Sequence, residues 1–387
     1  MIIHADRVLF ADHTVGPGEI TVDEGQITQV RSVSNRSDGA DHVEGLLAPG
    51  FVDTHVHGGG GGDFGTTDAD DAVRAQEFHR AHGTTTMLAS VVTDAVEAMV
   101  AQIGVLRGLR AEGRIAGIHL EGPFLSAARC GAHPPALLRA PDPATVEKLI
   151  MAGGDDLAMI TIAPELPGAL DAIARFSEAG VAVAVGHTSG NADDTLRALD
   201  AGASVATHLF NAMDPIHHRR PGPVPVLLND PRVQVELIAD GTHLAPEVLA
   251  MAISAAGVDR VALITDAMVA TGLADGRYGL GTLDVAVTDG VARLITADGS
   301  VGSIAGSTLT MARAVEYVTS TVGVPLADAV RMATSTPATG HGLPAGELLV
   351  DRLADLVVLD DHGRLTKVMA AGRWLDAPAS PTEGAPR

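Results

Sequence analysis

The stretch that decides the fold is FVDTHVH at residues 51–57, which runs directly into five glycines at 58–62. Residues two apart on a strand share a face, so His55 and His57 project together from the end of an apolar run. The glycines that follow have no side chains to block approach to the pair. The pattern indicates either two metal ligands or two histidines that are only hydrogen-bonded at a strand end. Further ligands at the ends of other strands would favour the metal.

The length and composition of the chain favour one large barrel and a smaller domain. An α/β barrel takes ~250 residues, and the chain has 387. Hydrophobic residues make up 46% but aromatic residues only 3%, so Ala, Val, Leu and Ile must fill the interior, as they do in buried parallel strands. No apolar run reaches the ~18 residues of a membrane span, and the N-terminal segment lacks the pattern of a signal peptide. We therefore expect a soluble, cytoplasmic protein.

Net charge restricts the binding partners that we expect, and cysteine content restricts the expected compartment. The formal net charge of −22 argues against a nucleic-acid or anionic-membrane partner, although a local basic patch can still bind an anion. A single cysteine, Cys130, excludes an internal disulfide framework and suits a reducing compartment. We assign Cys130 no role.

Apolar runs alternate with amphipathic helical stretches through the middle of the chain, as in βα units of a parallel sheet. Several of the helical stretches end at glycine, a common stop signal. Eight such units predict an α/β fold of the (β/α)8 TIM-like barrel type, which places its chemistry at the C-terminal ends of the strands. The strands are expected at 51–57, 84–92, 114–121, 157–163, 181–187, 204–208, 233–240 and 261–266.

Short strands with turn signals occupy both ends of the chain. Residues 1–47 and 345–387 are expected to meet in a small β-sandwich domain, with the barrel at 48–344 between them. The tail at 377–387 is rich in Pro, Ala and Gly and is expected to be disordered. Residues 272–305 are expected to form a hairpin region inserted after the eighth strand.

Metal-binding side chains stand at the ends of five expected strands. Each would lose hydration in the barrel mouth without a compensating partner, and a shared metal supplies that partner. Histidine and carboxylate ligands without thiolates suit Zn²⁺ or a similar divalent cation. The residues are His55 and His57, Glu121, His187, His208 and Asp266.

These residues divide into three expected roles. The tighter ligand set consists of Glu121, His187 and His208. His55 and His57 either hold a second cation bridged by Glu121 or steady a single one. Asp266 is expected to accept a proton from an attacking water and return it to a leaving amine. A plain ligand or a helix N-cap is the alternative for Asp266.

Several segments resemble the amidohydrolase superfamily and, within it, the N-acetylglucosamine-6-phosphate deacetylases. Many binuclear relatives bridge their metals with a carboxylated lysine at the end of strand four, but neither Lys148 nor Lys367 can stand there. The deacetylases use a glutamate from strand three, where Glu121 lies. The matching segments are PGFVDTHVHG, HLEGPFL, GHT followed by Asn191-Ala192, THLFNAM, ADGTH, ITDAM, IAGSTLTMARAV and ADLVVL.

The resemblance also implies substrate-binding residues. Asn211 and Ala212 would hold the sugar phosphate, and Arg219 would bind the phosphate through paired hydrogen bonds. His243 would contact substrate near the scissile carbonyl and stabilise the developing oxyanion. His133 would reach the sugar hydroxyls. An ordinary solvated loop remains the alternative for Arg219, and a surface loop position for His133. His119 is expected to be a hydrogen-bonded core residue.

The activity implied by the resemblance is metal-dependent hydrolysis of the N-acetyl group of N-acetyl-D-glucosamine 6-phosphate, in amino-sugar catabolism and cell-wall recycling. One or two divalent cations per subunit, a sugar phosphate substrate and a homodimer or homotetramer go with it. An amidohydrolase acting on another N-acyl amino sugar, an N-acyl amino acid or a cyclic amide is the alternative. A non-enzymatic scaffold is a third reading, but such relatives lose metal ligands that this chain keeps.

Overall fold

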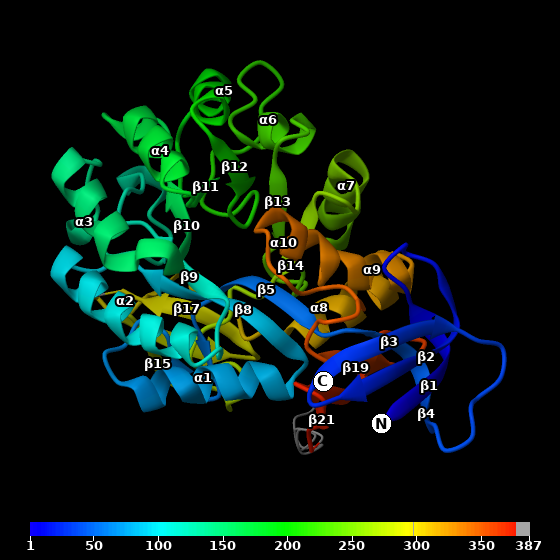
Figure 1. Ribbon diagram of the computed structural model, residues 1–387. Coiled ribbons are helices and arrows are strands. Elements are labelled where there is room, and N and C mark those ends of the chain that lie inside the picture. Colours follow the sequence, from blue (N-terminus) through cyan, green and yellow to red (C-terminus); the bar gives the residue numbers. More distant parts are fainter. Residues whose placement is uncertain (297, 377–387) are drawn as a thin grey trace.

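The computed structural model describes residues 1–296 and 298–376, so the tail at 377–387 lies outside the described residues. Eight parallel strands form the central sheet, in the order β14-β13-β12-β11-β10-β9-β8-β5 (Figure 1). The expected (β/α)8 barrel is confirmed. The strands are β5 (Phe51–Val56), β8 (Thr84–Val92), β9 (Gly117–Glu121), β10 (Leu157–Ile162), β11 (Ala182–Val185), β12 (Ala203–Ala206), β13 (Gln234–Ile238) and β14 (Val261–Ile264).

Backbone hydrogen bonds join the first and last strands of the barrel at their C-terminal ends. The Asp266 N–H donates to the His55 carbonyl over 2.9 Å, and the His57 N–H donates to the Ala267 carbonyl over 2.8 Å. These bonds hold residues 55–57 and 266–267, which are far apart in the sequence, next to each other.

The observed strands are one or two residues shorter at their C-terminal ends than expected in several places. His187, His208 and Asp266 lie just beyond β11, β12 and β14, with φ of 47°, 26° and 50°. Non-glycine residues rarely adopt positive φ, and such conformations are common at functional sites. The backbone therefore leaves the sheet at these residues.

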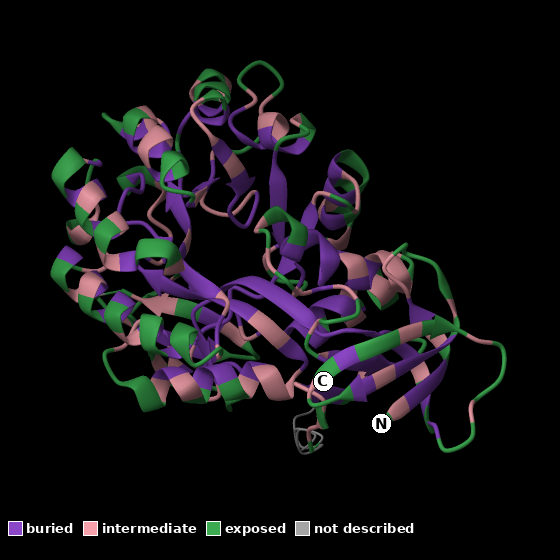
Figure 2. Ribbon diagram, viewed as in Figure 1, coloured by how far each residue is buried: buried purple, intermediate pink, exposed green. Residues whose placement is uncertain are grey.

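Helices surround the barrel (Figure 1). Figure 2 shows barrel strands made mostly of buried residues and helices in which buried and exposed residues alternate, as amphipathic periodicity predicts. Several helices begin at capping side chains, among them α1 at Asp68, α3 at Asp142 and α5 at Asn191. The helices are α1 (Ala69–Ala81), α2 (Val96–Ala111), α3 (Pro143–Gly153), α4 (Ala169–Glu178), α5 (Ala192–Asp200), α6 (Val224–Asn229), α7 (Pro246–Ala256), α8 (Met311–Tyr317), α9 (Leu326–Met332) and α10 (Ser335–Gly340).

Strands from both termini lie side by side in a second sheet (Figure 1). We expected a small β-sandwich from the two termini. The seven strands are instead hydrogen-bonded in series and form one continuous mixed sheet, in the order β21-β20-β19-β4-β1-β2-β3. Its apolar side chains, such as Ile3, Ile20 and Val358, form a core of their own. The strands are β1 (Ile2–Leu9), β2 (Val15–Asp23), β3 (Gln26–Ser32), β4 (Asp41–Pro49), β19 (Leu356–Leu359), β20 (Leu365–Ala370) and β21 (Arg373–Trp374).

The expected insertion after the eighth barrel strand is a four-stranded antiparallel sheet. Its side chains Leu280 and Val285 pack against Val92 and Met268 of the barrel, so the insertion lies over the barrel mouth. The strands are β15 (Gly276–Leu280), β16 (Leu283–Thr288), β17 (Val291–Ile295) and β18 (Val301–Ile304). The glycines after β5 form a two-stranded turn of β6 (Gly58–Gly59) and β7 (Gly62–Asp63). Within the described part of the chain, no helix has the length and apolar character needed to cross a bilayer.

Candidate active site

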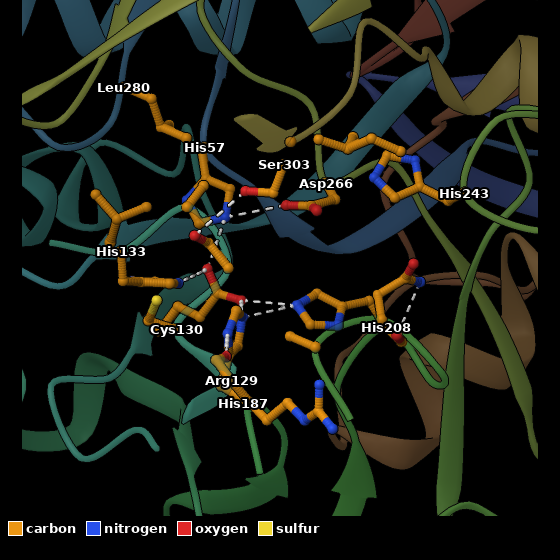
Figure 3. Close-up of a pocket in the computed structure, with 18 of the residues that line it drawn as sticks. His57, Arg129, Cys130, His133, His187, His208, His243, Asp266, Leu280 and Ser303 are labelled. Carbon is orange, nitrogen blue, oxygen red and sulfur yellow. Dashed lines mark hydrogen bonds and ion pairs between the residues drawn. The ribbon is translucent and has the colours of Figure 1, made fainter. Parts of the chain in front are cut away.

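A cavity of about 460 Å³ opens at the carboxyl ends of the barrel strands (Figure 3). The strand-end residues expected from the sequence converge on it from five strands. Its lining includes His57, Glu121, His187, His208 and Asp266, while His55 lies completely buried beneath them.

Glu121, the last residue of β9, lies at the centre of the cluster. Its Oε1 is 3.0 Å from Nε2 of His187 and 3.0 Å from Nε2 of His208, and these two nitrogens are 3.1 Å apart. Its Oε2 is 3.3 Å from Nε2 of His57. One carboxylate therefore joins two groups of histidines.

The second group consists of His55, His57 and Asp266. The Nε2 atoms of His55 and His57 are 3.0 Å apart. Oδ1 of Asp266 lies 3.2 Å from Nε2 of His57 and 3.6 Å from Nε2 of His55. Asp266 follows β14 and precedes the insertion, with no helix beginning next to it among the described residues. The helix N-cap alternative for Asp266 is therefore wrong.

The donor atoms of this cluster fit a divalent cation. Four imidazole nitrogens and the oxygens of two carboxylates converge in a buried volume. Two pairs of Nε2 atoms, those of His55 and His57 and those of His187 and His208, lie so close that only one proton fits between the atoms of each pair. In the described part of the chain, the ion-pair partners of Glu121 and Asp266 are all histidines. Nitrogen and oxygen donors without sulfur suit Zn²⁺ and related metals. The residues could thus hold one cation, or two that share Glu121.

The electrostatics of the cluster keep its acids ionised. Burial disfavours the carboxylate of Asp266, but hydrogen bonding to His57 and the charge of His55 outweigh it and lower the pKa of Asp266 to about 2. Burial also disfavours charge on His57, yet its hydrogen bonds to Asp266 and Glu121 raise the pKa of that ring to about 9. The carboxylates thus favour positive charge in this site, whether it is carried by protons on the imidazoles or by a bound cation.

His133 is buried against Glu121, so the surface-loop alternative is wrong. Only 3% of the residue is exposed, its Nε2 is 3.2 Å from Oε2 of Glu121, and its Nδ1 is 3.0 Å from the Thr93 hydroxyl. Burial lowers the pKa of His133 to about 4, which leaves the ring neutral at pH 7. His119 is confirmed as a core residue, since its ring nitrogens are hydrogen-bonded to Ser90 and Thr161.

His243 lines the cavity on the side of Asp266 (Figure 3). It follows β13, and its Nδ1 is 2.7 Å from Oδ2 of Asp240. Burial opposes charge on the ring, but the bond to Asp240 and the charge of Asp240 raise the pKa of His243. Because Nδ1 donates to Asp240, Nε2 is the nitrogen left for other partners.

The residues implied in phosphate binding divide between two cavities. Asn211 and Ala212 line the metal-site cavity, whereas Arg219 lines an adjoining one of about 760 Å³ and lies 2.7 Å from the ring of His218. Arg129, which lines the metal-site cavity, forms an ion pair of 2.6 Å with Asp214, which lines the adjoining cavity. The structure therefore does not bring Arg219 into the wall that contains Glu121.

The sequence did not point to several residues that shape the site. Arg129 accepts the Nδ1–H of His187 at its carbonyl over 2.9 Å, and Leu280 and Ser303 bring the insertion into the cavity wall. Asp53, two residues before His55, accepts hydrogen bonds from the Thr265 hydroxyl and the His55 N–H, and burial raises its pKa to about 7. Only Asp53 had a local signal, because it shares the strand face of the two histidines.

Known proteins resemble this chain over nearly its whole length. The model of the Amidohydrolase family matches residues 46–375. N-acetylglucosamine-6-phosphate deacetylase of Vibrio furnissii is 35% identical, covering 98% of this chain and 96% of that protein. N-acetylgalactosamine-6-phosphate deacetylase of Escherichia coli O157:H7 is 33% identical, covering 96% and 98%.

A solved structure is similar in both fold and sequence. It is an aspartate-to-alanine variant of N-acetyl-D-glucosamine-6-phosphate deacetylase from Mycobacterium smegmatis in complex with N-acetyl-D-glucosamine-6-phosphate, with a TM-score of 0.92 and 46% identity over 97% of this chain and 98% of that one. Family model, sequences and fold agree, and the chain belongs to the Amidohydrolase family.

Proposed function

We propose that the protein hydrolyses the N-acetyl group of N-acetyl-D-glucosamine 6-phosphate to give D-glucosamine 6-phosphate and acetate, in amino-sugar metabolism. The observation that carries the proposal is the buried cluster around Glu121, with Asp266 beside it, at the mouth of an amidohydrolase barrel. Full-length relatives with the same activity support the choice of substrate.

Glu121, His187 and His208 would hold one divalent cation, and His55 and His57 would contribute to a second that shares Glu121. We expect Zn²⁺, because the donors are imidazoles and carboxylates without thiolates. When bound, such a cation supplies Lewis-acid activation of the amide carbonyl and of water.

Asp266 is the proton carrier in this proposal. Its low pKa keeps it ionised at neutral pH, so it can accept a proton as water adds to the carbonyl carbon. The same carboxyl group then protonates the amine nitrogen as the C–N bond breaks, which releases acetate and the amino sugar. His243 lies on the same side of the cavity and would donate a hydrogen bond to the developing oxyanion.

We expect Asp240→Asn to move the alkaline limb of the profile of kcat/KM against pH to lower pH. With Nδ1 of His243 bonded to Asp240, a proton on Nε2 requires the doubly protonated ring. The Asp240 carboxylate raises the pKa of His243 and so keeps that form to higher pH. Removing the charge lowers that pKa, and activity that depends on the protonated ring is then lost earlier as pH rises. Asp171→Asn, on the exposed side of α4, is the control. An unmoved alkaline limb would exclude this role for His243.

The sugar phosphate would extend from the metal-site cavity toward the adjoining one. We place the phosphate between Asn211, Ala212 and Arg219, where a guanidinium can bind it through paired hydrogen bonds. His133, fixed by Thr93 beside Glu121, would face the sugar hydroxyls. We also expect a homodimer or homotetramer, which sedimentation analysis would test.

Arg219→Ala should raise KM for N-acetylglucosamine 6-phosphate by about 10- to 100-fold and change kcat little, since a hydrogen bond to a charged group contributes about 1.5–3 kcal/mol. Unphosphorylated N-acetylglucosamine should react equally slowly with variant and wild type. Arg364→Ala, which removes an exposed arginine from the terminal sheet region, is the matched control. Equal KM values for Arg219→Ala and wild type would show that this arginine does not bind the phosphate.

A second candidate substrate is the epimer N-acetylgalactosamine 6-phosphate, because a relative with that activity matches the chain over almost its full length. Steady-state comparison of the two phosphorylated sugars decides between them. We expect kcat/KM to be higher for the gluco epimer, and a higher value for the galacto epimer would reverse the assignment.

A further inference from the structure

Glu236 is a fully buried carboxylate in the middle of β13 that the reaction scheme above does not use. Its Oε2 is 3.2 Å from Nδ1 of His55, and its Oε1 accepts the hydroxyl of Thr54 over 3.1 Å. The backbone N–H of His208 points at Oε2 from 3.4 Å. Glu236 thus lies directly beneath ligands of both candidate metal positions.

The contact with Glu236 determines which nitrogen of His55 faces the other side chains of the cluster. When the neutral ring donates its Nδ1–H to Glu236, its Nε2 carries a free lone pair, 3.0 Å from Nε2 of His57 and 3.6 Å from Oε1 of Glu121. A carboxylate behind a histidine fixes its tautomer, orients its ring and makes it a stronger ligand. The ring of His55 is therefore prepared to bind a cation.

Other histidines of the cluster do not have such a partner. Nδ1 of His187 donates to a backbone carbonyl, and Nδ1 of His57 and of His208 has no hydrogen-bond partner in the part of the chain that the structure describes. Among these four rings, His55 is thus the one whose second nitrogen contacts a carboxylate.

The charge of Glu236 also favours a cation bound at His55. Glu121, Asp266 and Glu236 are three buried carboxylates, and among the described residues histidines are their ion-pair partners. A buried carboxylate is strongly destabilising unless a positive charge compensates it. His55 contacts all three carboxylates, so a cation held there would be stabilised by their combined charge.

We propose that Glu236 is the positioning residue of a second cation, held at His55 and His57, and that its carboxylate is required for that cation to be retained. The inference rests on the metal-dependent hydrolysis proposed above. It assigns Glu236 no contact with substrate, only a role through His55.

Glu236→Gln tests the inference, because the amide keeps the shape of the side chain and removes its charge. The purified variant and wild type are loaded with Zn²⁺, passed over a desalting column and analysed for zinc per chain by mass spectrometry. Titration with a chromophoric chelator then gives the affinity of each equivalent. We expect two equivalents in the wild type, and in the variant an about 10- to 100-fold weaker second equivalent with the first unchanged.

Two further variants complete the design. Glu236→Asp restores the charge and should recover part of the second-equivalent affinity, which a loss of packing alone would not explain. Glu178→Gln, on the exposed end of α4, should match the wild type. The inference is overturned if Glu236→Gln binds both equivalents as tightly as the wild type, or if the wild type holds only one equivalent and the variant keeps it.

Acetate release by the same wild-type sample separates this inference from the proposed function. A wild type that releases acetate, together with a Glu236→Gln variant of unchanged metal affinity, contradicts only the role of Glu236. A zinc-loaded wild type that releases no acetate contradicts the proposed function, whatever its metal count.

Discussion

Asp266→Asn should leave the protein folded and metal-loaded but reduce turnover of N-acetylglucosamine 6-phosphate by about 10²- to 10⁴-fold, the usual contribution of a positioned acid–base group. The amide keeps the size of the side chain and can still occupy the place beside His57. It cannot accept a proton from water or return one to the amine. We therefore expect kcat to fall with little change in substrate binding or in zinc content.

The zinc content of Asp266→Asn also distinguishes the two roles still open for this residue. If Asp266 serves only as a ligand, the variant loses metal in proportion to activity. Asp284→Asn, an exposed acid on β16, controls for the loss of one charge in an acidic protein. Substantial turnover in a fully loaded Asp266→Asn protein would show that another group carries the proton.

Glu121→Gln should have the second large effect, on metal content as well as on turnover. Oε1 of Glu121 contacts His187 and His208, while Oε2 contacts His57, so the carboxylate is shared by both candidate metal positions. Replacing a buried charge of this kind should weaken zinc binding by more than the about 10- to 100-fold typical of residues behind the ligands.

Glu121→Gln differs from Glu236→Gln in the pattern of loss. We expect Glu121→Gln to lose both zinc equivalents together and turnover with them, whereas Glu236→Gln should lose only one. Measurement of zinc per chain and of acetate release in the same preparation checks this. A Glu121→Gln protein that retains two tightly bound equivalents would contradict the placement of Glu121 at the centre of the site.

The barrel and its strand ends were predictable because their signals are local. An apolar run that ends in a polar residue, as at His57 or Glu121, is visible in a few consecutive residues. The parallel-sheet architecture then brings all carboxyl ends to one edge. The expected strands run too far at His187, His208 and Asp266, because a residue at positive φ still looks like strand in the sequence.

The remainder of the site depends on contacts that the sequence does not encode locally. Glu236 lies in a buried strand, and its partner His55 is 181 residues away in the sequence, so no local pattern links the two. His133 is buried because its loop folds back against Glu121, a path that composition could not reveal. Leu280 enters the cavity because the insertion packs on the barrel mouth.

Arg219 shows the limit of inference from the order of motifs. The resemblance to the deacetylases implied that Arg219 binds the phosphate, yet its side chain lines the adjoining cavity. The position of a charged side chain on an exposed loop depends on solvation and on its partners more than on the local sequence. The role of Arg219 in phosphate binding stays a prediction for kinetics to test.

The most direct test of the account is to measure acetate and zinc together in the wild-type protein, before and after chelation. Purified protein incubated with N-acetylglucosamine 6-phosphate should release one acetate for each glucosamine 6-phosphate formed. Removal of the metal should abolish the release, and added Zn²⁺ should restore it. Acetate release that continues unchanged in metal-free protein, or no release from fully loaded protein, would contradict the proposal of a metal-dependent deacetylase.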